Sequence, residues 1–166
     1  MSETIDLGPG RLRQVLGRFA TGVSVVTTLT GGHDHAMTAD TLTSVSLDPL
    51  LVLVCVQRDS RFHDAVVEAG VFGASILAAD QRAVSDWLAT PGRPLHGQLD
   101  RVPHRHGAAT GVALIEGGLG ALECRVRDVH PAGDHSIVVG EVVALTLPDD
   151  PGSALVHYRG GYASLT

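Results

Sequence analysis

Short polar side chains crowd the segment Thr38–Ser46, in which Thr, Ser and Asp are interleaved with a few small or apolar residues. A strand sends successive side chains to opposite faces, so this composition is a poor way to build a core. It suits the lining of a polar ligand site, where hydroxyl and main-chain N–H groups act as donors. An edge strand with a solvated face would show the same pattern, and the segment alone favours neither interpretation.

A second group of polar residues, Gln57–Arg61, stands directly before a predicted helix and includes Arg58, Ser60 and Arg61. Guanidinium groups, a serine hydroxyl and the amino end of a helix together suit a phosphate. A plain N-cap at Ser60 between solvated arginines would look the same, so both interpretations stand. A third group, Gly133–His135, opens a predicted strand, and taken alone it fits a turn better than a tuned imidazole.

Other site patterns are missing or weak. No GxGxxG follows a predicted strand, because the stretch 117–120 lacks the third glycine, and no GxxxxGK[ST] loop is present. No GxSxG elbow supports Ser/His/Asp hydrolysis. His33 and His35 form one HxH pair and His104 and His106 another. Both pairs are predicted to lie in loops, without a matching cysteine or carboxylate signature, so we expect no metal site.

The elements that position these residues are mainly strands. Leu12, Val15, Leu16 and Phe19 have the spacing of a short amphipathic helix over residues 11–20. β-Branched and apolar runs predict strands at 22–29, 37–46, 50–57, 71–77, 121–129, 135–147, 155–158 and 162–165. The strands follow one another too closely for repeated βαβ crossovers, which favours an antiparallel barrel.

Two further short helices and one long loop complete the predicted organisation. Ser60 and Asp80 are candidate N-caps of the helices, and Gly70 is a stop signal for the first of them. The loop covers about residues 90–110 and is rich in Gly, Pro and His. Loops of this length in a compact domain are usually functional or mobile.

Composition limits the classes of function. The 166 residues are 44% hydrophobic and 18% charged, which fits one β-rich domain over residues 1–166. A net charge of −6 without a polybasic run argues against nucleic acid or an anionic membrane as partner. The longest apolar run is too short to span a bilayer, and the acidic first six residues do not look like a secretory signal. Cys55 and Cys124 lack a CxxC partner, so we expect free thiols and a cytoplasmic protein.

Taken in order, these segments resemble the flavin reductase-like family, the reductase components of two-component flavin-dependent monooxygenases. The resemblance covers nearly the whole chain. It implies a mainly β fold, a split β-barrel with a few short helices, in a homodimer that binds FMN or FAD. The matching segments are Phe19–Val23, Met37–Ala39, Thr43–Pro49, Leu51–Cys55, Ser60, Leu77–Gln81, Leu122–Cys124, Gly133–His135, Gly140–Val142 and Tyr158–Tyr162.

The resemblance also implies which residues bind the cofactors. The flavin ring and ribityl chain would lie against Thr38, Ala39, Asp40 and Thr41. The phosphate end would be held by Gln57, Arg58, Ser60 and Arg61, with Asp80 and Gln81 nearby. His135 would face the nicotinamide as the catalytic residue, with Tyr158, Arg159 and Tyr162 close to the same pocket. Ser44, Val45, Ser46 and Cys55 complete the expected cofactor-binding set.

Some positions depart from the family pattern. Asp40, Thr41 and Leu42 stand where Asn or Ser, then Ser, then Phe are common, Ser75 stands where Asn is common, and Gly161 where Arg is common. A carboxylate beside the ring would disfavour an anionic reduced flavin. We therefore expect Asp40 to contact the ring through its main chain.

The expected activity is reduction of free FAD or FMN by NADH or NADPH, with NADH favoured, and delivery of the reduced flavin to a partner monooxygenase. A flavin carrier or sensor would keep the same pocket without oxidising NADH. An FMN-dependent oxidase of the related pyridoxamine phosphate oxidase-like group would hold its flavin tightly. A ligand-free structural dimer would require the hydroxyl-rich segment and the phosphate-like segment to be coincidences.

Overall fold

The structure is a computed structural model that describes residues 7–165. The acidic residues 1–6, from which we expected no secretory signal, lie outside this range. The helices are α1 (Pro9–Leu16), α2 (Arg61–Ala69), the 3-10 turn η1 (Ala79–Gln81) and α3 (Arg82–Ala89). The strands are β1 (Thr21–Gly22), β2 (Ser24–Thr30), β3 (His33–Ala39), β4 (Thr43–Leu47), β5 (Leu50–Gln57), β6 (Val71–Ile76), β7 (His104–His106), β8 (Ala113–Ile115), β9 (Gly120–Ala132), β10 (His135–Thr146), β11 (Leu155–Tyr158) and β12 (Gly161–Ser164).

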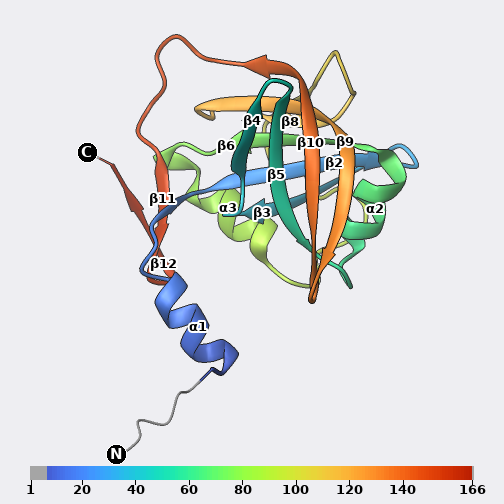
Figure 1. The fold of residues 1–166 in the computed structure, drawn as a ribbon. Helices are drawn as coiled ribbons and strands as arrows, with labels where there is room; N and C mark the ends of the chain where they lie inside the picture. Colours follow the sequence, from blue (N-terminus) through green and yellow to red (C-terminus); the bar gives the residue numbers. More distant parts are fainter. Residues whose placement is uncertain (1–6, 166) are drawn as a thin grey trace, which may run out of the picture.

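Seven strands form one antiparallel sheet in the order β3-β2-β6-β9-β10-β5-β4. Figure 1 shows β5, β10 and β9 side by side in front of β2 and β3, so the sheet curls back on itself. The edge strands β3 and β4 do not pair with each other within residues 7–165. The chain passes between them, and there Thr41 Oγ1 accepts a 3.0 Å hydrogen bond from the Cys55 N–H. The predicted split barrel is thus confirmed.

Aliphatic side chains and two aromatic rings, Phe62 and Phe72, fill the barrel. Val54 and Val56 of β5 are fully buried and pack in one cluster with Phe72 of β6 and Cys124 of β9. The Phe72 ring lies directly on the main chain of Gly140 in β10. A Cβ at Gly140 would come within 2.5 Å of two ring carbons. A larger residue at this position would force the ring to move, because interiors are close-packed.

A second apolar cluster covers the outer face of β2 and β3. Val25 and Ala36 of these strands contact Leu88 of α3 and, from the long loop after it, Leu99 and Val102. All five side chains are buried. The loop is therefore anchored on the sheet by its own apolar side chains, and this fixes the polar residues that it carries.

The predicted signals for α2 are confirmed. The second predicted helix is also confirmed, as α3, but its predicted N-cap is wrong. Ser60 caps α2, since its hydroxyl oxygen accepts a 3.1 Å hydrogen bond from the His63 N–H. Gly70 ends the helix in the left-handed region with φ +66°. Asp80 does not cap α3, because the chain first forms η1 and α3 begins only at Arg82. In η1 the Gln81 side chain accepts the Ala78 N–H at 2.9 Å.

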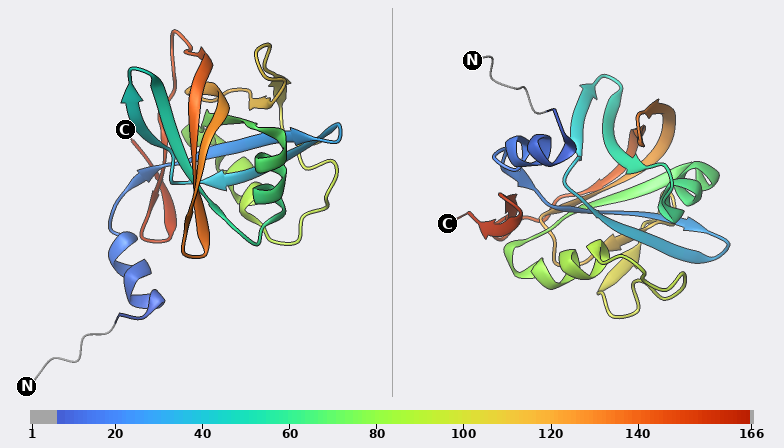
Figure 2. Two further views of the ribbon diagram at one scale, coloured as in Figure 1. Left: turned by 45° about the vertical axis from the view of Figure 1, so that its right-hand side comes forward. Right: turned by 90° about the horizontal axis from the view of Figure 1, so that it is seen from below.

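Three other predicted segments differ from the structure. The expected strand 37–46 is interrupted at residues 40–42, because the chain there crosses from one edge of the sheet to the other. The helix expected over 11–20 ends at Leu16, and none of its residues is buried. Figure 2 shows α1 outside the barrel, beyond the β11–β12 hairpin. Both HxH pairs lie in strands, β3 and β7, and not in loops.

Candidate active site

A pocket of about 710 Å³ opens beside the edge strand β3. One wall is the stretch His35–Thr41, formed by β3 and the first residues after it. The second wall contains Asp59–Phe62 at the amino end of α2, with Cys55 and Gln57 of β5. The third wall is the stretch Leu88–Arg93, which begins at the end of α3 and continues into the loop after it, together with Gln98. His135 at the start of β10 lies at the rim.

Two guanidinium groups meet in this pocket. Arg61 donates a 2.6 Å hydrogen bond to the Arg93 carbonyl oxygen. The Arg93 guanidinium donates to the carbonyl oxygens of Thr90 at 2.6 Å and Ala36 at 2.9 Å. Its Nε is buried and has no partner among the described residues. Burial and the nearby Arg61 lower the pKa of Arg93, so an anion between the two groups would be stabilised.

The histidine of the pocket wall, His35, is buried beneath these cations. Its Nε2 lies 2.9 Å from Thr30 Oγ1. Burial lowers the pKa of His35, and the positive charge of Arg61 lowers it further. The neutral imidazole is favoured as a result, and the two arginines supply the positive charge of this wall.

Hydroxyl groups of the Thr38–Ser46 segment mostly bind other parts of the protein. Thr38 donates to the Ser85 carbonyl oxygen at 2.7 Å, and Thr41 accepts from the Cys55 N–H. Ser46 Oγ accepts from the Asp48 N–H at 3.2 Å. These bonds hold the segment in place. Thr38 uses its hydroxyl proton in them, whereas Thr41 and Ser46 only accept, so the Thr41 hydroxyl can still donate to a ligand in the pocket.

The carboxylate of Asp40 points toward β11, where its Oδ2 lies 3.7 Å from His157 Nδ1. This orientation agrees with the expectation that Asp40 meets a ligand through its main chain. Burial, with the Asp40 charge as a second cause, raises the pKa of the Cys55 thiol, which lines the same pocket. The thiol is therefore kept protonated.

His135 is held at the rim by its neighbour. Its Nδ1 is 2.7 Å from Asp134 Oδ1, and its main chain pairs with Gln57 of β5. The hydrogen bond from His135 lowers the pKa of Asp134. The imidazole side chain is 44% exposed, so one edge of the ring stays open to a ligand in the pocket.

The sequence of residues 16–166 matches the family model described as the flavin reductase like domain. The chain belongs to the flavin reductase like family. It is 44% identical over 163 residues to an NADH-dependent flavin reductase of Rhodococcus sp, covering 96% of this chain and 88% of the relative. It is 36% identical to the reductase component of 4-hydroxyphenylacetate 3-monooxygenase of Thermus thermophilus, over 92% of this chain and 94% of the relative.

A solved structure in this family carries both cofactor types. The NADH:FAD oxidoreductase of Streptomyces globisporus C-1027, in complex with NAD and FAD fragments, superposes on this chain with a TM-score of 0.90. The two are 34% identical, and the match covers 99% of this chain and 98% of that one. The family predicted from the ordered motifs is therefore confirmed.

Half of the predicted cofactor-binding residues of this flavin reductase meet in the large pocket, and half do not. Those that line it are Thr38, Ala39, Asp40, Thr41, Cys55, Gln57, Ser60, Arg61 and His135. The others lie elsewhere. Ser44 lines a mainly apolar pocket with Phe19 and Thr21, which adjoins the large pocket at Ala39 and Asp40. Arg159 lines another pocket with Arg13 and Arg18.

Several of the remaining predicted residues have structural partners. Tyr162 donates to or accepts from Ser85 Oγ at 2.7 Å and stacks under the Arg82 guanidinium, beside the pocket and not in it. Gln81 closes η1 and also donates to the Glu116 carbonyl oxygen. The Arg58 guanidinium is 3.5 Å from the Gly133 carbonyl oxygen. Val45, Ser46, Asp80 and Tyr158 are not among the residues that line the large pocket.

The sequence did not identify one complete wall of the site. Arg93, Gln98 and the stretch Thr90–Gly92 lie on the long loop. Its length and composition marked it as functional or mobile, but no local pattern distinguished Arg93 from other loop arginines. His35 was considered only as part of an HxH pair in a predicted loop, and Phe62 lies in an ordinary helix pattern, so neither was assigned to the site. Only the fold brings them to the pocket.

Proposed function

We propose that this flavin reductase transfers a hydride from NADH to free FAD or FMN and releases the reduced flavin to a flavin-dependent monooxygenase. The observation that carries the proposal is the pair Arg61 and Arg93, two guanidinium groups facing one pocket beside a small-residue strand edge. Each relative described above acts on a flavin, on NADH or within a two-component monooxygenase. Within the activity, we propose NADH as the preferred donor.

The residues present fit a flavin phosphate at the Arg61–Arg93 end of the pocket. The buried Arg93 Nε, which has no hydrogen-bond partner within residues 7–165, provides an N–H for such an anion. The amino end of α2 lines the same part of the pocket. The Ser60 hydroxyl holds this end in place, because it donates to the Gln57 carbonyl oxygen at 2.7 Å and accepts from the His63 N–H. We assign the ring to the opposite wall, against the main chain of Ala39 and Asp40, where small side chains allow close approach.

The cofactors supply the hydride chemistry, and the protein supplies binding, orientation and electrostatics. Arg61 and Arg93 anchor the phosphate and so fix the position of the flavin. His135 at the rim orients the nicotinamide, and its hydrogen bond to Asp134 sets the direction of the imidazole. Holding two reactants in contact removes much of the entropic barrier of a bimolecular step. Phe62 and Leu88, both buried, exclude water from the pocket floor.

We further propose that the chain forms one domain over 1–166 and works as a cytoplasmic homodimer. The apolar face of α1 supports the dimer, because Leu12, Val15 and Leu16 of the helix, and Phe19 shortly after it, are each more than half exposed. Cys55 and Cys124 are free thiols, which fits a reducing compartment. No helix in the described part of the chain is long and apolar enough to cross a bilayer.

The test is a turnover assay. Purified protein is mixed with NADH or NADPH and with excess FAD or FMN, and loss of NADH absorbance is followed. Many turnovers per chain, faster with NADH, would support the proposal and rank the flavins. Flavin binding without NADH loss would indicate a carrier, and flavin that stays bound through purification would indicate an oxidase. A coupled assay with a flavin-dependent monooxygenase then tests delivery.

A further inference from the structure

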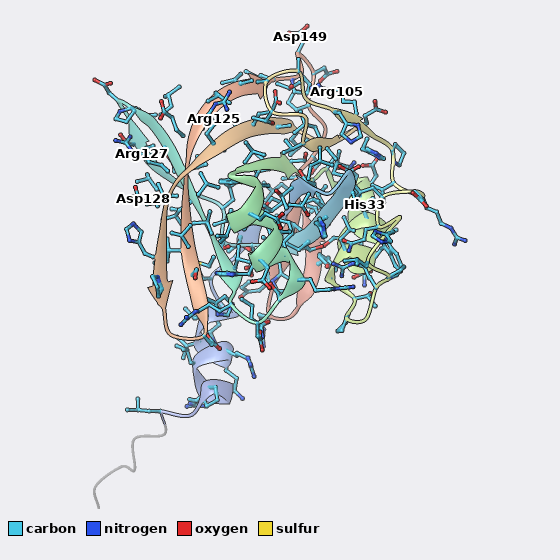
Figure 3. All side chains as sticks on the ribbon, turned by 90° about the vertical axis from the view of Figure 1, so that its right-hand side faces the viewer. His33, Arg105, Arg125, Arg127, Asp128 and Asp149 are labelled. Carbon is cyan, nitrogen blue, oxygen red and sulfur yellow. The ribbon has the colours of Figure 1, made fainter. Side chains whose placement is uncertain are left out.

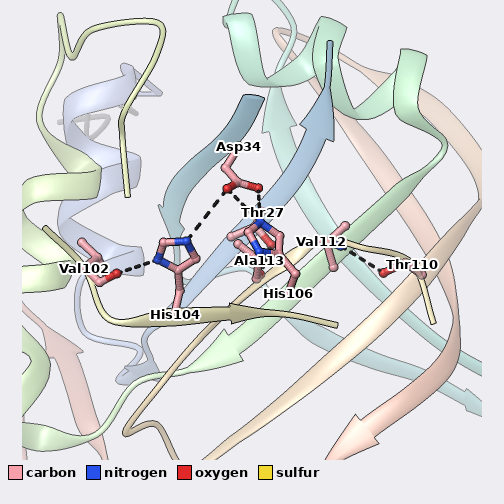
Figure 4. Close-up of polar contacts among 8 residues, drawn as sticks. All are labelled: Thr27, Asp34, Val102, His104, His106, Thr110, Val112 and Ala113. Carbon is pink, nitrogen blue, oxygen red and sulfur yellow. Dashed lines mark hydrogen bonds and ion pairs between the residues drawn. The ribbon is translucent and has the colours of Figure 1, made fainter. Parts of the chain in front are cut away.

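Three side chains with metal-ligand atoms converge on the face of the sheet behind the flavin pocket. Asp34 comes from β3, and His104 and His106 come from β7, far along the chain (Figure 4). One oxygen or nitrogen atom from each lies within 4.8 Å of the other two. Asp34 and His104 are about one-fifth exposed and His106 is half exposed, so the cluster is open on one side.

The hydrogen bonds of the histidines prepare them for a cation. His104 Nδ1 lies 2.7 Å from the Val102 carbonyl oxygen, which can only accept, so Nδ1 carries the proton. In the neutral ring the lone pair of Nε2 then faces Asp34 Oδ2 at 4.0 Å. His106 Nε2 already lies 3.0 and 3.1 Å from the two Asp34 oxygens. A backbone carbonyl that holds the second nitrogen is the usual support of a metal-bound histidine.

The strand that carries the two imidazoles, β7, is held in place on both sides. β7 pairs with β8, and Arg105, whose side chain points away from the histidines, donates to Thr146 Oγ1 in β10 at 2.6 Å. Figure 3 shows Arg105 and His33 at the same side of the molecule, away from Arg127 and Asp128 of β9. Zinc ligands in a tetrahedral site lie about 3.3 Å apart. The cluster needs only small side-chain shifts to reach this spacing.

The geometry points to a binding site for a divalent transition metal ion of the zinc type at Asp34, His104 and His106, with water in the fourth position. Imidazole and carboxylate are ligands that such ions prefer. The ion displaces the proton that His106 shares with Asp34. This site is separate from the residues assigned to flavin and NADH.

The ion would fasten the long loop to β3 next to the flavin pocket. Two side chains of that loop already bind the main chain of Ala36, since Gln98 accepts the Ala36 N–H and Arg93 donates to its carbonyl oxygen. Asp34 lies two residues away on the same strand. A metal ion bound by Asp34 and the two histidines of β7 would therefore add a third link between β3 and the long loop, next to those made by Gln98 and Arg93.

The test uses untagged, flavin-free protein and Co²⁺ as a spectroscopic probe. We expect one Co²⁺ per chain, visible d–d bands of a four-coordinate site and no thiolate charge-transfer band. Zn²⁺ should displace Co²⁺ and raise the melting temperature. His104→Gln should weaken Co²⁺ binding at least about tenfold, whereas His130→Gln on β9, also an exposed histidine, should not change it. Asp34→Asn provides a second variant should His104→Gln misfold.

Three results would overturn the assignment. One is equal Co²⁺ affinity in wild type, His104→Gln and Asp34→Asn. Another is a thiolate charge-transfer band, which would place the ion at Cys55 or Cys124. The last is loss of binding in His33→Gln with binding retained in His104→Gln, because His33 stacks on His96 with ring centroids 3.7 Å apart and offers the nearest alternative pair. Reductase turnover does not enter any of these readouts.

Discussion

The Arg61 guanidinium donates a 2.6 Å hydrogen bond to the Arg93 carbonyl oxygen, joining the start of α2 to the loop after α3. The bond crosses the pocket from one wall to another. It places Arg61, the first residue of α2, beside the loop residue Arg93. Burial of Arg93 and the positive charge of Arg61 both lower the pKa of Arg93. Two like charges are brought together here at an energetic cost, which a bound anion would offset.

Replacement of Arg61 should weaken flavin binding. Arg61→Ala removes a charge-assisted contact to the phosphate, and we expect the Michaelis constant for FMN to rise about tenfold, equivalent to about 1.4 kcal/mol. Arg58→Ala is the matched control, because Arg58 is a nearby exposed arginine that does not line the pocket. Steady-state kinetics with FMN and with riboflavin, which lacks the phosphate, measure the effect. Equal losses in the two variants, or an equal loss with riboflavin, would contradict the phosphate assignment.

Local patterns predicted the parts of the site that one segment can build alone. The Gln57–Arg61 stretch was found because its cap, its arginines and the helix start are consecutive, and the structure places Ser60 at that cap. The barrel was likewise predictable from strand spacing. The hydrogen bond that joins β3 to the long loop connects Ala36 with Arg93, which are more than fifty residues apart in the sequence. A pattern within one short segment cannot predict such a long-range contact.

Other features that the sequence did not show have a similar cause. The hydroxyls of Thr38 and Thr41, two residues that line the pocket, bind Ser85 and Cys55, partners that only the fold supplies. The histidines at 104 and 106 were predicted in a loop because Gly and Pro surround them. The short β7–β8 pairing, which converts that stretch into a strand, has three residue pairs, and such short strands have weak sequence patterns.

Cys124 should make the protein lose stability in alkali. Burial raises the pKa of this thiol from 9.0 to about 12, so the folded state holds its proton more tightly than the unfolded state does. The resulting stabilisation is complete below pH 9 and is lost as the pH rises toward about 12. Cys124→Ala should therefore show a shallower fall in melting temperature between about pH 8 and about pH 10.5. If the melting temperatures of the variant and the wild type fall in parallel with pH, this role is contradicted. A constant difference in melting temperature between them would reflect only the smaller alanine side chain.

The apolar face of α1 should be required for dimerisation. Leu12→Glu with Val15→Glu places two charges on a face that no part of the described chain covers. We expect the double variant to be a monomer in light scattering with size-exclusion chromatography, while far-UV circular dichroism stays unchanged. Gln14→Glu, on the same helix but outside the apolar stripe, should remain a dimer. A dimeric double variant would show that another surface holds the subunits together.

Removal of the His135 imidazole should affect NADH more than flavin. The ring is held at the rim by Asp134 at 2.7 Å and is partly exposed, a placement that suits orientation of the nicotinamide. His135→Ala should raise the Michaelis constant for NADH about tenfold and change kcat much less, since it removes binding rather than transition-state stabilisation. Asp134→Asn, which keeps the imidazole but weakens its support, should give a smaller rise of the same kind. The assignment fails if His135→Ala leaves both constants unchanged, and a loss confined to kcat would instead make His135 part of the chemical step.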